Sequence, residues 1–164
     1  DAAFLKVVAR NVEALNHATR NIAPERMRMH VCWGNYEGPH HRDIALDRII
    51  DVILRARPRI LSIEGANPRH AHEWAVFAHK SLPEDKILAP GVIDSTSNFI
   101  EHPELVAQRI ENYAKLVGRE RVIASSDCGF ATFNTTPTVF PDIVWKKLEA
   151  MAEGARIASR RLWP

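Results

Sequence analysis

Short apolar segments alternate with longer amphipathic segments along the whole chain of 164 residues. In the amphipathic segments, apolar residues recur every three or four positions, which is the period of a helix buried on one face. The short segments are apolar throughout or alternate in polarity, which is typical of strands. The sequence predicts helices at residues 3–17, 43–55, 70–82, 103–118 and 142–163, and strands at residues 26–33, 60–64, 86–94 and 121–127.

This order, one helix followed by four strand–helix units, predicts a parallel sheet flanked by helices. Two architectures fit the pattern, an open doubly wound sheet and half of a (β/α)8 barrel. A whole barrel takes about 250 residues, so length alone favours the open sheet. Both folds place their functional sites at the carboxyl ends of the strands. The sequence contains no glycine-rich dinucleotide fingerprint and no phosphate-binding loop.

Capping and breaking residues locate several boundaries. Asp43 is predicted to cap the helix that starts beside it, since a carboxylate accepts from free backbone N–H groups there. Pro103 suits the first turn of its helix, and Gly118 suits the stop at the other end. Pro90 and Gly91 predict a bend within the third strand.

Residue types that bind metals gather at the predicted strand ends. His30 and Cys32 are two positions apart at the end of the first strand, so their side chains face the same way. Glu64 ends the second strand and Cys128 follows the fourth. Because the ends of parallel strands meet at one edge, these four residues form a set that Zn²⁺ accepts. In the alternative interpretation, the cysteines are buried core residues or pair as a disulfide, which is rare in a reducing compartment.

Composition sets broader bounds. Hydrophobic residues make up 46% of the chain and charged residues 26%, as in an ordinary globular protein. A net charge of +2 does not predict binding to nucleic acid or to an anionic membrane, and no apolar run approaches the roughly 20 residues of a membrane span. With two cysteines and no visible signal peptide, the predicted setting is the cytoplasm.

Four sequence segments together carry a family resemblance: "MHVCWGN", "LSIEGANPRH", "APGVIDSTSN" and "ASSDCGFAT". They resemble the zinc-binding, carboxyl-terminal half of the cobalamin-independent methionine synthase family. More narrowly, they are similar to its short single-barrel members related to epoxyalkane:coenzyme M transferase. The resemblance covers essentially the whole chain. It implies a (β/α)8 barrel, and so selects the half-barrel over the open sheet.

The resemblance also implies a metal centre and a reaction. In the family, one zinc ion is bound by residues that match His30, Cys32, Glu64 and Cys128. Zinc holds an acceptor thiol as the nucleophilic thiolate, which attacks an electrophilic carbon. The donor is a methyl-folate in the methionine synthases and an epoxide in the coenzyme M relatives. The implied substrates are therefore a small-molecule thiol, such as homocysteine, and an alkyl donor.

The sequence departs from the methionine synthases at one position. Thr96 stands where the family carries a histidine thought to donate a proton. This puts methionine synthesis itself in question and leaves proton handling to Asp94 or a bound water. Arg69 and Asp127 are predicted to contact substrate, and Arg69 suits a carboxylate or sulfonate; the alternative for Arg69 is a salt bridge within its loop.

The chain matches only the second half of such a barrel. Residues 1–164 are therefore predicted to form a single partial domain, with two open strand edges that invite pairing. We expect the missing barrel half or a second copy as partner, and no efficient turnover by this chain alone. A non-catalytic zinc-binding domain is the alternative function, and an unrelated metal hydrolase is a weaker one because two thiolates are unusual in hydrolytic sites.

Overall fold

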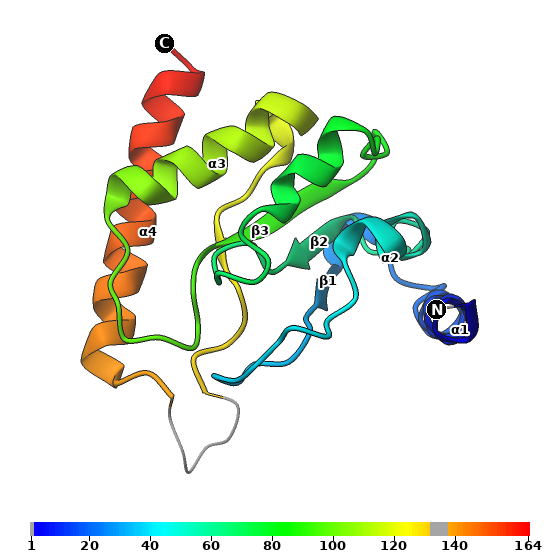
Figure 1. Cartoon of the computed structure of the whole chain (residues 1–164). Helices are drawn as coiled ribbons and strands as arrows, with labels where there is room; N and C mark the ends of the chain where they lie inside the picture. Colours follow the sequence, from blue (N-terminus) through cyan, green and yellow to red (C-terminus); the bar gives the residue numbers. More distant parts are fainter. Residues whose placement is uncertain (1, 132–137) are drawn as a thin grey trace.

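The structure is a computed structural model that describes residues 2–131 and 138–164. A four-stranded sheet forms its centre, and helices follow the strands (Figure 1). The α-helices are α1 (Ala2–Ala18), α2 (Leu46–Ile53), α3 (Pro103–Val117) and α4 (Pro141–Leu162), and the strands are β1 (Arg28–Val31), β2 (Ile60–Ile63), β3 (Ile87–Ile93) and β4 (Ser125–Ser126). Three short 3-10 helices cover Pro24–Arg26, Glu73–Ala78 and Arg119–Arg121.

The strands are parallel and lie in sequence order, β1-β2-β3-β4. In register, His30 of β1 lies opposite Ser62 of β2, and Ser62 lies opposite Ala89 of β3. The order does not reverse in the middle of the sheet, as it would in a doubly wound fold. The predicted fold class, four βα units arranged as half of a (β/α)8 barrel, is confirmed.

Helices cover one face of this sheet. In Figure 1, α2, α3 and the 3-10 helix Glu73–Ala78 lie on the same side of the strands, while α1 lies beside α2 and α4 beside α3. The apolar strand residues Leu61, Ile63 and Leu88 are buried in the core that these helices cover. A second cluster joins β3, α3 and α4 through Val92, Val106 and Ala158. Because Met29, Val31, Leu61 and Ile63 pack in the first core, alternation along β1 and β2 places His30 and Ser62 on the opposite face of the sheet.

Local sequence sets the ends of α3 as predicted. Pro103 occupies the first turn, and Nδ1 of His102 accepts a hydrogen bond from the backbone N–H of Glu104. Gly118 ends the helix with a φ of 96°, a left-handed conformation that glycine adopts without strain. Near the bend predicted at Pro90 and Gly91, the structure has a register shift between Gly91 and Ile93 where β3 pairs with β4.

Three predictions about elements need correction. Asp43 does not cap α2: Ala45 precedes the helix without a side-chain cap, and the Asp43 carboxylate meets His40 and His70 instead. The helix predicted at 70–82 is only the 3-10 helix Glu73–Ala78, and the buried Glu73 in its first turn accepts a hydrogen bond from the Leu46 backbone N–H. The fourth strand is shorter than predicted, with one further isolated bridge from Val122 to Leu88.

Over the part of the chain described, no helix is both long and apolar enough to cross a membrane. The outer strands of the sheet are β1 and β4, each with a neighbouring strand on one side. An outer strand presents unpaired N–H and C=O groups along its free edge.

Candidate metal centre

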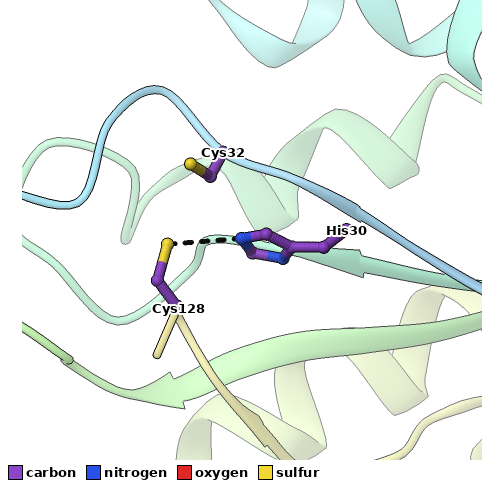
Figure 2. A group of neighbouring side chains, drawn as sticks. All are labelled: His30, Cys32 and Cys128. Carbon is purple, nitrogen blue, oxygen red and sulfur yellow. Dashed lines mark hydrogen bonds between the residues drawn. The ribbon is translucent and has the colours of Figure 1, made fainter. Parts of the chain in front are cut away.

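Three predicted ligands meet where the strands end. His30 lies on β1, Cys32 follows β1 by one residue, and Cys128 follows β4 by two. The His30 ring nitrogen and the two sulfur atoms all lie within 4.8 Å of one another. Figure 2 shows the His30 ring and the Cys128 sulfur pointing toward each other, with Cys32 above them. The parallel sheet thus brings together His30 and Cys128, which are 98 positions apart in the sequence.

The orientation of His30 follows from its neighbours. Its Nδ1 atom lies 3.2 Å from the hydroxyl oxygen of Ser62, the residue opposite it in register. Its Nε2 atom lies 3.3 Å from Sγ of Cys128. A hydrogen bond at one ring nitrogen fixes the ring and directs the other nitrogen toward a metal, as is usual for histidine ligands. Ser62 therefore orients His30.

Glu64 lies beside the three ligands rather than among them. Its carboxylate is buried, and Oε1 lies 3.8 Å from the sulfur of Cys128. Oε1 also accepts a hydrogen bond from the backbone N–H of Trp33, at 2.8 Å, and Oε2 accepts one from the Asn67 amide, at 2.7 Å. Oε2 has a second lone pair left, and Oε1 regains one if the Cys128 thiol loses its proton, so the carboxylate can still bind a cation.

These donors fit zinc. One imidazole, two thiols and an adjacent carboxylate form a mixed N, S and O set that suits a borderline-soft ion. The spacing of the three principal donor atoms matches ligands that share one ion, since atoms about 2.0–2.3 Å from a common centre lie roughly 3–4.5 Å apart.

Burial and like charges oppose ionisation at this centre when no cation is present. Burial raises the pKa of the Cys128 thiol, and the Glu64 carboxylate and Cys32 raise it further. Partial burial lowers the pKa of His30, although Glu64 acts in the opposite direction. The centre therefore favours a neutral His30 imidazole and a neutral Cys128 thiol until a positive charge binds.

The carboxylate of Asp127 is buried and bonded to the loop that follows β2. It accepts hydrogen bonds from the backbone N–H groups of Gly65, Ala66 and Asn67, each at 2.8 Å, and from the Asn67 amide at 3.0 Å. Burial raises the pKa of this carboxyl to about 6, although these hydrogen bonds act in the opposite direction. Gly91 leaves room for this carboxylate, because a Cβ at position 91 would lie 1.8 Å from Oδ1 of Asp127. Asp127 thus fastens the loop after β2 to the end of β4.

A cleft of about 720 Å³ opens beside the centre and includes Glu64 and Cys128 in its wall. Asp94, predicted to handle protons, lies in this wall. Its Oδ1 atom accepts hydrogen bonds from the N–H and the hydroxyl of Thr96, and its own N–H donates to Glu101. Arg69 also lines the cleft, is exposed, and donates to the carbonyl of His41 at 3.3 Å.

Sequence reasoning missed the residues that support the ligands. Ser62, Trp33 and Asn67 each hold a predicted ligand or its loop. The alternation of β2 offered a signal for Ser62 alone, because a serine two positions before Glu64 shares its face. Trp33 acts through its backbone N–H, and Asn67 acts from a loop, so neither leaves a pattern in the sequence.

Comparison with known proteins supports the sequence resemblance. Residues 21–156 match the family described as "Cobalamin-independent synthase, Catalytic domain". A 2-hydroxypropyl-CoM lyase from Xanthobacter autotrophicus is 27% identical, covering 92% of this chain and 45% of the lyase. A methionine synthase from Thermococcus kodakarensis is 26% identical, covering 92% of this chain and 39% of the synthase.

The fold has a solved counterpart. The structure of a B12-independent methionine synthase from a Shewanella species, in complex with selenomethionine, superimposes with a TM-score of 0.69 at 20% identity. The match covers 92% of this chain and 43% of that one. The chain thus spans less than half the length of the curated relatives it matches. Since the family match extends over most of the sequence, the chain belongs to the cobalamin-independent synthase family.

Proposed function

We propose that this chain provides the zinc centre for transfer of an alkyl or methyl group to a thiol acceptor. The observation that carries the proposal is the convergence of His30, Cys32 and Cys128, whose donor atoms lie within 4.8 Å of one another at the strand ends. Membership in a family whose matched relatives include a methionine synthase and a 2-hydroxypropyl-CoM lyase supports the same reaction class.

In this proposal His30, Cys32, Glu64 and Cys128 hold one Zn²⁺ ion. When bound, zinc lowers the pKa of an acceptor thiol and keeps it as the nucleophilic thiolate near neutral pH. Ser62 keeps Nε2 of His30 directed at the centre through its contact with Nδ1. Asp127 holds the loop that carries Asn67, and Asn67 in turn holds the Glu64 carboxylate. We therefore give Asp127 a positioning role in place of the predicted contact with substrate.

The cleft beside the centre supplies the remaining groups. Asp94 lines this cleft. Its Oδ1 atom accepts two hydrogen bonds from Thr96, whereas its Oδ2 atom has no hydrogen-bond partner among the described residues. Asp94 is thus placed to accept or return a proton during thiol alkylation. Arg69 carries its guanidinium at the exposed side of the same cleft, where it suits a carboxylate or sulfonate of the acceptor.

The opposite wall of the substrate site is proposed to come from a partner, either the other half of a barrel or a second copy of this chain. The chain covers less than half of its matched relatives, and within residues 2–131 and 138–164 each outer strand pairs on one side only. We therefore expect metal binding by this chain alone and efficient turnover only with the other wall in place.

The test combines metal content with thiol alkylation. The chain is purified alone and together with an amino-terminal barrel half taken from a matched relative, and each sample is assayed for zinc and for methyl or epoxide transfer to homocysteine and to a thiol sulfonate. The expected result is one zinc per chain, with turnover in the paired sample. Cys128→Ser should abolish this turnover, whereas His79→Asn, at an exposed position outside the cleft, should retain it. Bound zinc without turnover of any pair would favour the non-catalytic zinc domain. Absence of zinc would refute the proposal.

A further inference from the structure

A buried cluster of charged side chains lies beside the metal centre. His70 is 2% exposed, and both of its ring nitrogens face carboxylates. Nδ1 lies 2.7 Å from Oε2 of Glu73, and Nε2 lies 3.2 Å from Oδ2 of Asp43. An ionised carboxylate only accepts hydrogen bonds, so His70 can donate to both partners at once only in its protonated form. Burial lowers the pKa of His70, but the bonds to Glu73 and Asp43 outweigh it and raise the pKa overall.

The His70 ring supports Trp33. The two rings are stacked, with centroids 4.2 Å apart and an angle of 26° between their planes. Trp33 is also held at its indole N–H, which donates to the Ile44 carbonyl at 2.7 Å. Its backbone N–H donates to Oε1 of Glu64. Trp33 therefore has Cys32 as its chain neighbour and Glu64 as its hydrogen-bond partner.

The same cluster fastens the far end of the loop that carries these residues. Residues 32–45 contain no helix or strand, and most of the segment from Tyr36 to Pro39 is exposed. Asp43 contacts His70 and also His40, at 2.8 Å, near the end of this loop. Glu73 accepts from the backbone N–H of Leu46, where α2 begins. His70 thus joins the start and the end of the loop to the segment that follows β2.

We propose that His70 is a positioning residue that holds Trp33 in place and thereby sets Cys32 and Glu64 at the distances needed to share a metal with Cys128. This inference rests on the proposed zinc centre for its purpose, but the geometric effect that it predicts does not require metal. A histidine that only filled the core would contribute to stability and leave the spacing of the ligands unchanged in the folded chain.

The experiment compares three variants. His70→Asn removes the stacked ring, and Asp43→Asn removes the charge of one carboxylate while keeping its shape. His79→Asn is the matched control, because His79 ends the same 3-10 helix, pairs with the single carboxylate of Asp47 at 2.8 Å, and is 61% exposed. Circular dichroism and thermal unfolding establish the folded fraction of each variant.

Two readouts follow. The first is measured on metal-free chain: the rate at which diamide forms a disulfide between Cys32 and Cys128, followed by mass spectrometry. The two thiols lose two electrons and two protons, which reduce the azo bond of diamide to a hydrazine.

The second readout is Co²⁺ binding, followed through the sulfur-to-cobalt charge-transfer band. We expect His70→Asn and Asp43→Asn to slow the disulfide about tenfold and to weaken Co²⁺ binding about 10–100-fold, the usual cost of losing a residue that orients a ligand. His79→Asn should match the wild type in both.

Unchanged disulfide rates in folded His70→Asn or Asp43→Asn would overturn the proposal. If His70→Asn does not fold, Asp43→Asn decides, since the Asp43 side chain is 16% exposed and asparagine keeps its hydrogen-bonding shape. Failure of the zinc centre gives a different result: wild type would bind no Co²⁺, while the two variants would still slow the disulfide.

Discussion

Two buried carboxylates follow two strands of the same sheet, and their surroundings differ. Asp127, after β4, accepts four hydrogen bonds from residues 65–67. Glu64, after β2, accepts one hydrogen bond from Trp33 and one from Asn67, and its Oε1 accepts a third, at 3.8 Å, from the thiol of Cys128. Position at a strand end therefore does not by itself identify a ligand. The number of protein donors already bound to a carboxylate shows whether it serves the fold or remains available to a cation.

The loop between the two carboxylates links them. Asn67 donates its side-chain amide to both Glu64 and Asp127, at 2.7 and 3.0 Å. Asp127 is thus expected to affect the metal centre through the position of this loop, and Glu64 is expected to affect it directly. This contrast predicts that the Asp127 variant is defective mainly in stability and the Glu64 variant mainly in metal binding.

The largest effect on the free energy of unfolding is expected from Asp127→Ala. Three backbone N–H groups lose a charged acceptor in a buried site, which should lower the free energy of unfolding by about 4 kcal/mol. Urea denaturation followed by circular dichroism measures the change. Asp142→Ala, an exposed aspartate in the first turn of α4, serves as the control and should stay close to wild type. A loss below about 1 kcal/mol for Asp127→Ala would contradict the structural role.

Gly91→Ala tests the space that Asp127 occupies. The added Cβ would lie 1.8 Å from Oδ1 and 2.7 Å from Cα of Asp127, so the strand or the carboxylate must move. We expect a loss of about 3 kcal/mol in the free energy of unfolding. Gly129→Ala is the matched control, because a Cβ at Gly129 meets no atom within 4 Å. Equal stability of the two variants would mean that Asp127 is not packed against Gly91 as described.

Glu64→Gln tests the other carboxylate. A glutamine oxygen can keep one of the two hydrogen bonds from Trp33 and Asn67, so the free energy of unfolding should fall by only about 1 kcal/mol. The affinity for zinc, measured by competition with a chromophoric chelator, should fall about tenfold or more because the negative charge is lost. Glu84→Gln, at an exposed position, controls for loss of charge. Full zinc affinity in Glu64→Gln would remove Glu64 from the ligand set.

The smallest effect on the free energy of unfolding is expected from Tyr113→Phe. The Tyr113 hydroxyl is buried below Gly65 and has no hydrogen-bond partner among the residues that the structure describes. Burial, with the nearby Asp127 carboxylate, raises the pKa of this phenol, so the hydroxyl stays neutral. Removing an unpaired buried hydroxyl should leave stability unchanged or raise it by up to about 1 kcal/mol. A clear loss of stability in thermal unfolding would show that the hydroxyl has a partner.

The fold was largely predictable because its signals are local. Apolar periodicity located the four strands, and Pro103 and Gly118 marked the ends of α3. The ligand candidates His30 and Cys32 stood out for the same reason, since alternation on one strand places them together. Four motif segments added the family, which the match over residues 21–156 confirms.

The rest depended on contacts between distant residues. The partners of Asp127 lie 60 to 62 positions away, so nothing near Asp127 in the sequence distinguished a loop anchor from a substrate ligand. Asp43 looked like a helix cap, but its carboxylate is engaged by His70, which is 27 positions away. Tertiary hydrogen bonds of this kind override local preference and leave no periodic signal.

The most direct test of the central claim is zinc K-edge X-ray absorption of the purified chain loaded with one equivalent of zinc. The account predicts two sulfur scatterers at about 2.3 Å, from Cys32 and Cys128, together with nitrogen and oxygen scatterers at about 2.0–2.2 Å, from His30 and Glu64. A spectrum with only oxygen and nitrogen neighbours, or with a single sulfur, would contradict a centre built by these four residues.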